Sequence, residues 1–166
     1  MNKTVFLDRD GLINKKAPEH EYICKFEDFE FLPGVKDAVS RLTKAGFTVI
    51  VITNQRGIAR NKVTRAQVDE IHRLMCEALD AVGAHISAVY VCPHNIGECR
   101  CRKPDIGMFL MAENDFEIDK TNSWMVGDSI SDVEAGRNYG VRTILTDDLS
   151  RAAEIILSDN LTETTL

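Results

Sequence analysis

Long hydrophobic runs are absent from this sequence. Its longest apolar stretch, Phe47 to Ile52, is far too short to span a bilayer, and no positively charged leader precedes an apolar segment. We therefore expect a cytoplasmic protein that has no membrane partner.

Positive charge is also scarce, because 20 basic residues face 26 acidic ones and leave a net charge of −6. A chain without an overall basic field is not expected to have nucleic acid as its main partner. The balance does not exclude a phosphate ligand, because such a ligand needs only a few local cations.

Internal repeats, low-complexity tracts and linkers are missing as well, so the sequence suggests no domain boundary. Its 166 residues are enough to bury a hydrophobic core without disulfides. We expect a single domain over residues 1–166, and a monomer.

Five short apolar runs alternate with stretches of helical periodicity. The runs predict strands at 4–7, 47–52, 86–91, 123–126 and 141–145, and the periodic stretches predict helices at 33–45, 64–82, 108–114, 131–138 and 151–157. Asp105 is expected to cap the third helix, and Ser131 with Glu134 to form a capping box on the fourth. His72 is expected at the surface or boundary of the second helix. The alternation predicts an α/β fold with a doubly wound parallel sheet.

The first predicted strand ends abruptly in Asp8 and Asp10, which are followed by Gly11. Ligands of a parallel α/β sheet bind at the carboxyl ends of the strands, and Gly11 permits a turn that would point both carboxylates into one crevice. Paired carboxylates repel each other unless a cation lies between them, so the pair predicts a divalent metal ion, most simply Mg²⁺. Taken alone, the pair fits equally well with two aspartates that only cap a turn.

Polar residues follow two other predicted strands in the same way. Thr53 and Asn54 come at the end of the second strand, and Asp128 comes at the end of the fourth. Because parallel strands end at the same edge of the sheet, these side chains are expected close to Asp8. The hydroxyl and the amide could hold phosphoryl oxygens.

A metal and a phosphate could share this edge. Asp8, Asp128 and a backbone carbonyl near Asp10 would suit Mg²⁺, and Lys103, in the loop after the third strand, would add a positive charge. Phosphoryl transfer requires little beyond positioning and charge neutralisation, and a carboxylate can itself be the nucleophile. The sequence therefore predicts phosphoryl-transfer chemistry.

The order of these groups resembles the haloacid-dehalogenase superfamily of phosphatases over nearly the whole chain. The superfamily's four motifs are met by Asp8-Arg9-Asp10-Gly11, Thr53-Asn54, Lys103, and Gly127-Asp128 with Asp132. The resemblance implies a Rossmann-like core, an aspartyl-phosphate intermediate on Asp8, and Asp10 as the general acid and base. It favours these roles over turn capping.

Three thiols and one imidazole lie within ten residues, at Cys92, His94, Cys99 and Cys101. Such crowding favours metal binding over disulfides in a cytosolic chain. A Cys₃His set is a closed tetrahedral zinc site, so we predict a structural Zn²⁺ that fixes the loop bearing Lys103. The alternative is a group of buried free cysteines beside an unrelated histidine.

This loop and the segment 53–60 resemble the heptose-bisphosphate phosphatase branch of the superfamily, with the histidinol-phosphatase branch as a near relative. The resemblance implies that the zinc loop replaces a large cap domain, and that a small phosphorylated sugar contacts Thr53, Asn54, Gln55, Arg56, Arg102 and Lys103. Leu12, Arg56, Ser129 and the short zinc loop depart from the heptose pattern, and Arg56 could equally be a solvated charge. A zinc-stapled binding module without catalysis is the alternative function.

Overall fold

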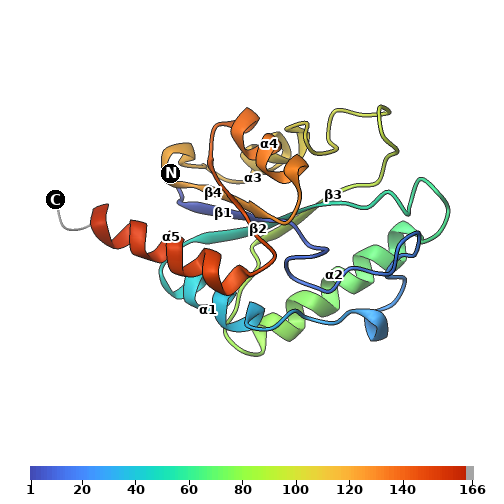
Figure 1. The fold of residues 1–166 in the computed structure, drawn as a ribbon, viewed down its shortest axis with the longest axis horizontal. Helices are drawn as coiled ribbons and strands as arrows, with labels where there is room; N and C mark the ends of the chain where they lie inside the picture. The colour runs from blue at the N-terminus through green and yellow to red at the C-terminus, as the bar shows by residue number, and fades with distance from the viewer. Residues whose placement is uncertain (164–166) are drawn as a thin grey trace.

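The structure is a computed structural model that describes residues 1–163. Its centre is a five-stranded parallel sheet in the order β3-β2-β1-β4-β5, so the first strand lies in the middle (Figure 1). The strands are β1 (Thr4–Leu7), β2 (Thr48–Asn54), β3 (Ala88–Cys92), β4 (Trp124–Gly127) and β5 (Arg142–Leu145). The helices are α1 (Val35–Lys44), α2 (Arg65–Asp80), α3 (Gly107–Asp115), α4 (Ile130–Tyr139) and α5 (Leu149–Glu163), with 3₁₀ turns at Phe26–Asp28 and Lys120–Asn122.

Helices cover both faces of the sheet. In Figure 1, α3 and α4 lie above the sheet, whereas α1, α2 and α5 lie below it. Successive side chains of β1 point to opposite faces, so Val5 and Leu7 join one hydrophobic cluster and Phe6 joins the other. A strand that is buried on both faces needs apolar side chains at every position, which explains the continuous apolar run in the sequence.

The doubly wound parallel sheet predicted from the sequence is confirmed, and every predicted helix and strand is present. Most bounds agree within two residues, but α5 runs six residues beyond its expected end at Leu157. Two predicted caps are wrong. Helix α4 begins earlier than expected, because the carboxylate of Asp132 accepts hydrogen bonds from the backbone N–H and hydroxyl of Ser129, not from Ser131. Ile106 stands at the N-cap of α3 without a side-chain cap, so the predicted cap, Asp105, lies one residue before that position, in a turn where its N–H donates to the carbonyl of Arg102.

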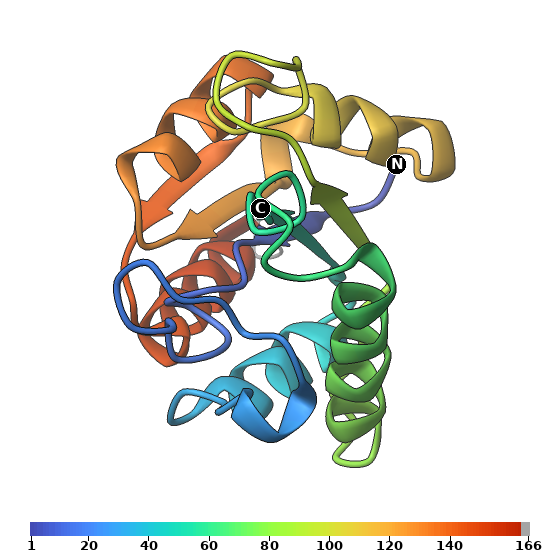
Figure 2. The ribbon, with the colours of Figure 1, turned by 90° about the vertical axis from the view of Figure 1, so that its right-hand side faces the viewer.

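The carboxyl ends of the strands carry the longest loops. Figure 2 views the molecule from this end, where the segments that follow β1, β2 and β3 face the reader. The amino-terminal end of the sheet lies on the opposite side, near the N-terminus (Figure 1). Within residues 1–163, no helix combines the length and the apolar character that crossing a membrane requires.

Gly136 lets α4 pack directly onto the sheet. A Cβ at this position would lie 2.7 Å from Cβ of Met125 and 2.7 Å from Cγ2 of Thr143, so the helix approaches β4 and β5 too closely for any side chain. The position of α4 in turn fixes Asp132, one turn earlier on the same helix.

We expect Gly136→Ala to lower the free energy of unfolding by about 1–3 kcal/mol, because the added methyl must push α4 off the sheet. This loss should exceed the gain of about 1 kcal/mol that alanine brings to a helix interior. Urea unfolding measures the change, with Glu134→Ala on the exposed side of α4 as the control. A Gly136→Ala protein more stable than the wild type would show that α4 is not closely packed.

Candidate active site

A buried lysine organises the carboxyl edge of the sheet. The ammonium of Lys103 donates to Oδ1 of Asp8 at 2.7 Å, to the backbone carbonyl of Ile52 at 2.8 Å, and pairs with Oδ1 of Asp132 at 2.7 Å. Burial lowers the pKa of Lys103, but the two carboxylates outweigh it and raise the pKa overall, so the ammonium stays charged. All three of its donors are used.

Asp8 directly follows β1, and its side chain is 13% exposed. Burial raises the pKa of Asp8 to about 6, Lys103 opposes that shift, and the negative charge of Asp132 adds to it. Oδ2 of Asp8 accepts no hydrogen bond from the residues that the structure describes, so one oxygen is held and the other is available to a ligand.

Three carboxylates converge here and could hold a metal ion. One oxygen each from Asp8, Asp128 and Asp132 lies within 4.8 Å of the others. Asp128 follows β4, as the sequence predicts, and also pairs with the ammonium of Lys16. Gly11 makes this approach feasible, because it has φ of +91° and a Cβ there would meet Oδ2 of Asp128.

The carboxylate of Asp10 belongs to a different network. It accepts from Nη2 of Arg9 at 2.8 Å, from the amide of Asn14 at 2.9 Å and from the amide of Gln55 at 2.8 Å. Burial alone would raise the pKa of Asp10, but the Arg9 guanidinium and these hydrogen bonds outweigh it and lower the pKa below its usual value. The side chain of Asp10 therefore lies outside the three-carboxylate group, and only its backbone carbonyl remains for a metal.

The end of β2 connects the two networks. Thr53 is buried, and its hydroxyl accepts from the same Gln55 amide that reaches Asp10, at 2.9 Å. The side chain of Asn54 binds the backbone of Lys103 twice, donating to its carbonyl at 3.2 Å and accepting from its N–H at 3.1 Å. Asn54 thus holds the lysine loop in place.

An open cavity of about 290 Å³ lies beside these groups. It is lined by the loop from Lys16 to Ile23 (the first long loop), by Arg9 and Asp10, and by the segment from Asn54 to Arg56. Arg56 donates to the amide oxygen of Asn95 at 3.2 Å, which ties the cavity to the cysteine loop.

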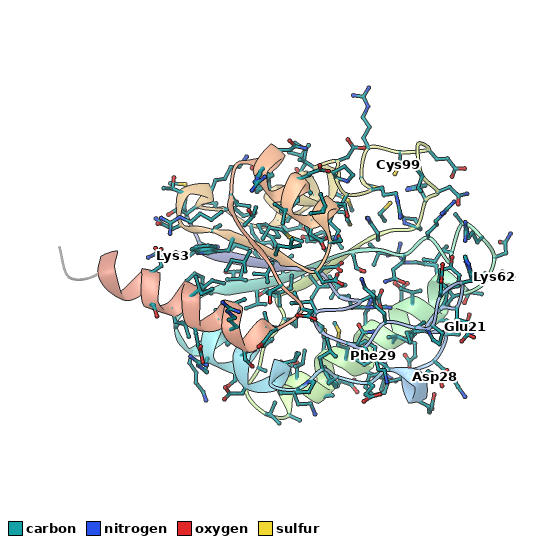
Figure 3. All side chains as sticks on the ribbon, in the orientation of Figure 1. Lys3, Glu21, Asp28, Phe29, Lys62 and Cys99 are labelled. Atoms are coloured by element: carbon teal, nitrogen blue, oxygen red, sulfur yellow. The ribbon has the colours of Figure 1, made fainter. Side chains whose placement is uncertain are left out.

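Cys92, His94, Cys99 and Cys101 come together as the sequence predicts. Neighbouring ligand atoms lie 3.3–3.7 Å apart. The shortest distance joins Nδ1 of His94 to Sγ of Cys101, and the longest joins Sγ of Cys92 to Nδ1 of His94. Ligands at about 2.3 Å around a tetrahedral ion stand roughly this far apart. Figure 3 shows Cys99 on this loop, at the same end of the molecule as Glu21 and Lys62.

Two residues of this region differ from the sequence-based expectation. Asp132 joins the carboxylate group, although the superfamily motif is the only sequence signal that includes it. His72 is buried, not at the surface, because its ring fills the space next to Arg9. Nη1 of Arg102 is buried with no hydrogen-bond partner among the described residues.

Comparison with known proteins finds relatives that are named phosphatases. A family model described as polynucleotide kinase 3 phosphatase matches residues 3–155. A D-glycero-beta-D-manno-heptose-1,7-bisphosphate 7-phosphatase from Escherichia coli O6:H1 is 42% identical over 147 residues, covering 84% of this chain and 76% of the relative. The protein of the same name from Haemophilus ducreyi is 40% identical over 149 residues, covering 85% of this chain and 80% of the relative.

Solved structures agree with these relatives. The crystal structure of D,D-heptose 1.7-bisphosphate phosphatase from B. bronchiseptica, complexed with magnesium and phosphate, is 31% identical with a TM-score of 0.81, covering 95% of this chain and 99% of that one. Because the family model spans most of the chain and relatives match it over most of their own length, the chain belongs to the polynucleotide kinase 3 phosphatase family and is a phosphatase of the haloacid-dehalogenase type.

Proposed function

We propose that this chain is an Mg²⁺-dependent phosphatase that removes the C7 phosphate of D-glycero-D-manno-heptose 1,7-bisphosphate. The observation that carries the proposal is the environment of Asp8: Lys103 binds one of its oxygens, and two further carboxylates lie beside it. The chain is also 42% identical to a phosphatase of that name. In this role the chain would supply nucleotide-activated heptose for lipopolysaccharide or another surface glycan.

Asp8 is the proposed nucleophile. Its free oxygen attacks phosphorus in line with the bond to the sugar oxygen, that bond breaks, and an aspartyl phosphate forms. Lys103 keeps Asp8 ionised and oriented, because a protonated carboxyl group would neither attack nor pair with the ammonium. Water then attacks phosphorus and releases Asp8.

Asp10 is the proposed proton carrier. It would give a proton to the leaving sugar oxygen and then take one from the attacking water. Arg9 and two amides hold it ionised in the free protein. The approach of a phosphate dianion opposes that negative charge and favours uptake of the proton that the leaving oxygen needs.

A divalent cation fits the three-carboxylate group. Asp8 and Asp128, with Asp132 beside them and the backbone carbonyl of Asp10 as a further oxygen donor, offer the hard oxygen ligands that Mg²⁺ prefers. When bound, Mg²⁺ would offset the charge of these carboxylates and of the phosphoryl oxygens. The B. bronchiseptica relative was crystallised with magnesium and phosphate.

Zn²⁺ is the proposed occupant of the cysteine loop. With three thiols and one imidazole as ligands, the tetrahedral shell is complete, so the ion would be structural. The loop it closes leads within two residues to Lys103, and Asn95 in the same loop binds Arg56. Zinc binding would therefore set the positions of both cationic side chains.

The substrate is proposed to lie in the cavity between the first long loop and Arg56. Arg56 and Arg102 are the cations that would meet its phosphate oxygens, and the buried Nη1 of Arg102 still lacks an acceptor among the described residues. A sugar carrying two phosphates would supply acceptors at both ends of such a site.

Asp8→Asn should abolish phosphate release from heptose bisphosphate in the presence of Mg²⁺, with a loss on the order of 10⁴-fold or more, because an amide cannot form the acyl phosphate. A phosphate-release assay measures it, and Asp37→Asn on the exposed side of α1 serves as the control. Turnover retained by the Asp8→Asn protein would rule out Asp8 as the nucleophile. A wild-type protein that turns over no sugar phosphate would favour the binding module.

Cys99→Ser should lower the zinc content well below one ion per chain and reduce the phosphatase rate, because the loop that orients Lys103 loses a ligand. Elemental analysis and the same assay measure the two effects. Cys76→Ser on α2, away from the cysteine loop, is the matched control. Full zinc content together with full activity in the Cys99→Ser protein would contradict the structural role.

Heptose bisphosphate should have the highest kcat/KM in a panel that contains both of its anomers, a heptose monophosphate and histidinol phosphate. The loss of one phosphate removes an anionic group that the arginines are proposed to bind, so the monophosphate should show mainly a raised KM. If histidinol phosphate is turned over with the higher kcat/KM, the sugar assignment is wrong and the reaction class stands.

A further inference from the structure

A fully buried guanidinium lies between the acidic turn after β1 and helix α2. Arg9 is 1% exposed, and its Nε and Nη2 both donate to the carboxylate of Asp10, at 3.2 Å and 2.8 Å from Oδ1. The guanidinium carbon lies 5.9 Å from the ring centre of Phe29, the residue that follows the 3₁₀ turn Phe26–Asp28. Figure 3 shows Phe29 below the sheet, on the side of α2.

The remaining edge of this guanidinium meets a histidine. Nη1 of Arg9 lies 3.0 Å from Nε2 of His72, and the ring of His72 is 6% exposed. Arginine has only N–H donors, so Nε2 must be the acceptor, and the ring must carry its single proton on Nδ1. The contact therefore requires a neutral imidazole in one tautomer.

The surroundings of His72 agree with a neutral ring. Burial and the positive charge of Arg9 lower the pKa of His72 to about 3, and Arg65 acts in the same direction. The carboxylates of Asp10 and Asp69 oppose the shift without cancelling it. His72 thus stays a hydrogen-bond acceptor throughout the neutral pH range.

We infer that His72 is a positioning residue for Asp10: its Nε2 fixes the buried guanidinium of Arg9, and that guanidinium in turn aims the carboxylate of Asp10. This inference rests on the proposed function, in which Asp10 is the general acid and base. His72 does not itself line the cavity and does not belong to the three-carboxylate group, so it would act only through Arg9.

The effect of His72 on Asp10 follows from the charge and burial of Arg9, which lies between them. Without an acceptor at position 72, Nη1 of Arg9 would be left unpaired in an enclosed site, and the guanidinium would rotate or draw water in to satisfy it. Asp10 would then lose the two-donor contact that sets its orientation. Its other partners, the amides of Asn14 and Gln55, are neutral, and the Gln55 amide is shared with Thr53.

His72→Leu and His72→Gln separate this role from simple space filling. Leucine fills much of the ring's volume without an acceptor, whereas glutamine can place an amide oxygen near the former Nε2 position. His72→Met gives a second apolar variant if the leucine protein does not fold. His85→Leu, at an exposed histidine in the loop after α2, is the matched control.

The informative quantity is kcat/KM for heptose bisphosphate divided by kcat/KM for p-nitrophenyl phosphate. A sugar oxygen needs a proton to leave, whereas p-nitrophenolate leaves without one, so a misplaced general acid slows only the first reaction strongly. The fraction of folded enzyme cancels in this ratio, so a loss of stability alone does not change it.

We expect His72→Leu to lower the ratio roughly tenfold, which is part of the 10²-fold or greater contribution typical of a general acid. His72→Gln should restore most of the ratio, and His85→Leu should leave it unchanged. Wild-type ratios in both the His72→Leu and His72→Met proteins would overturn the inference. Asp10→Asn distinguishes a failure of the proposed acid role of Asp10 from a failure of the positioning role of His72. If Asp10→Asn also leaves the ratio unchanged, the acid role of Asp10 has failed. If Asp10→Asn lowers the ratio and the His72 variants do not, only the role of His72 is refuted.

Discussion

The buried ammonium of Lys103 is the interaction on which the acidic edge depends. Asp8, Asp128 and Asp132 would repel one another if they were brought together without a cation. Lys103 offsets part of this repulsion by pairing with Asp8 and Asp132, and the carbonyl of Ile52 takes its third donor. Since Ile52 lies on β2, directly beside β1, the strand pairing itself places the ammonium next to Asp8.

The position of Lys103 depends in turn on the loop that bears it. Asn54, at the end of β2, forms two hydrogen bonds with the backbone of Lys103. The last residue of the cysteine cluster, Cys101, lies two residues before Lys103. The same cluster carries Asn95, which binds Arg56 at the cavity. One short loop therefore contacts both the proposed reacting end and the proposed recognition end of the site.

The sequence predicted the sheet and the convergence of Asp8, Thr53 and Asp128, because continuous apolar runs mark buried parallel strands and such strands end at one edge. It could not reveal that Asp10 turns away from the other carboxylates, since that depends on how the turn after β1 orients Arg9 and Asn14, and on Gln55 reaching Asp10 from the end of β2. The burial of His72 was missed for a similar reason. Helical periodicity shows which face is apolar, but not that the charged side chain of Arg9, in the turn after β1, needs an acceptor there.

Because β1 is the central strand of the sheet, the residues proposed to react with phosphate sit on the most enclosed part of the fold, while those proposed to recognise the rest of the ligand sit on peripheral loops. Loops at the edge of a fold tolerate exchange better than its central strand does. A lineage can exchange its loops and acquire a new ligand while the chemistry on the middle strand is inherited intact. A separation of this kind fits a chain that matches both a family model described by a polynucleotide phosphatase and relatives named for a sugar.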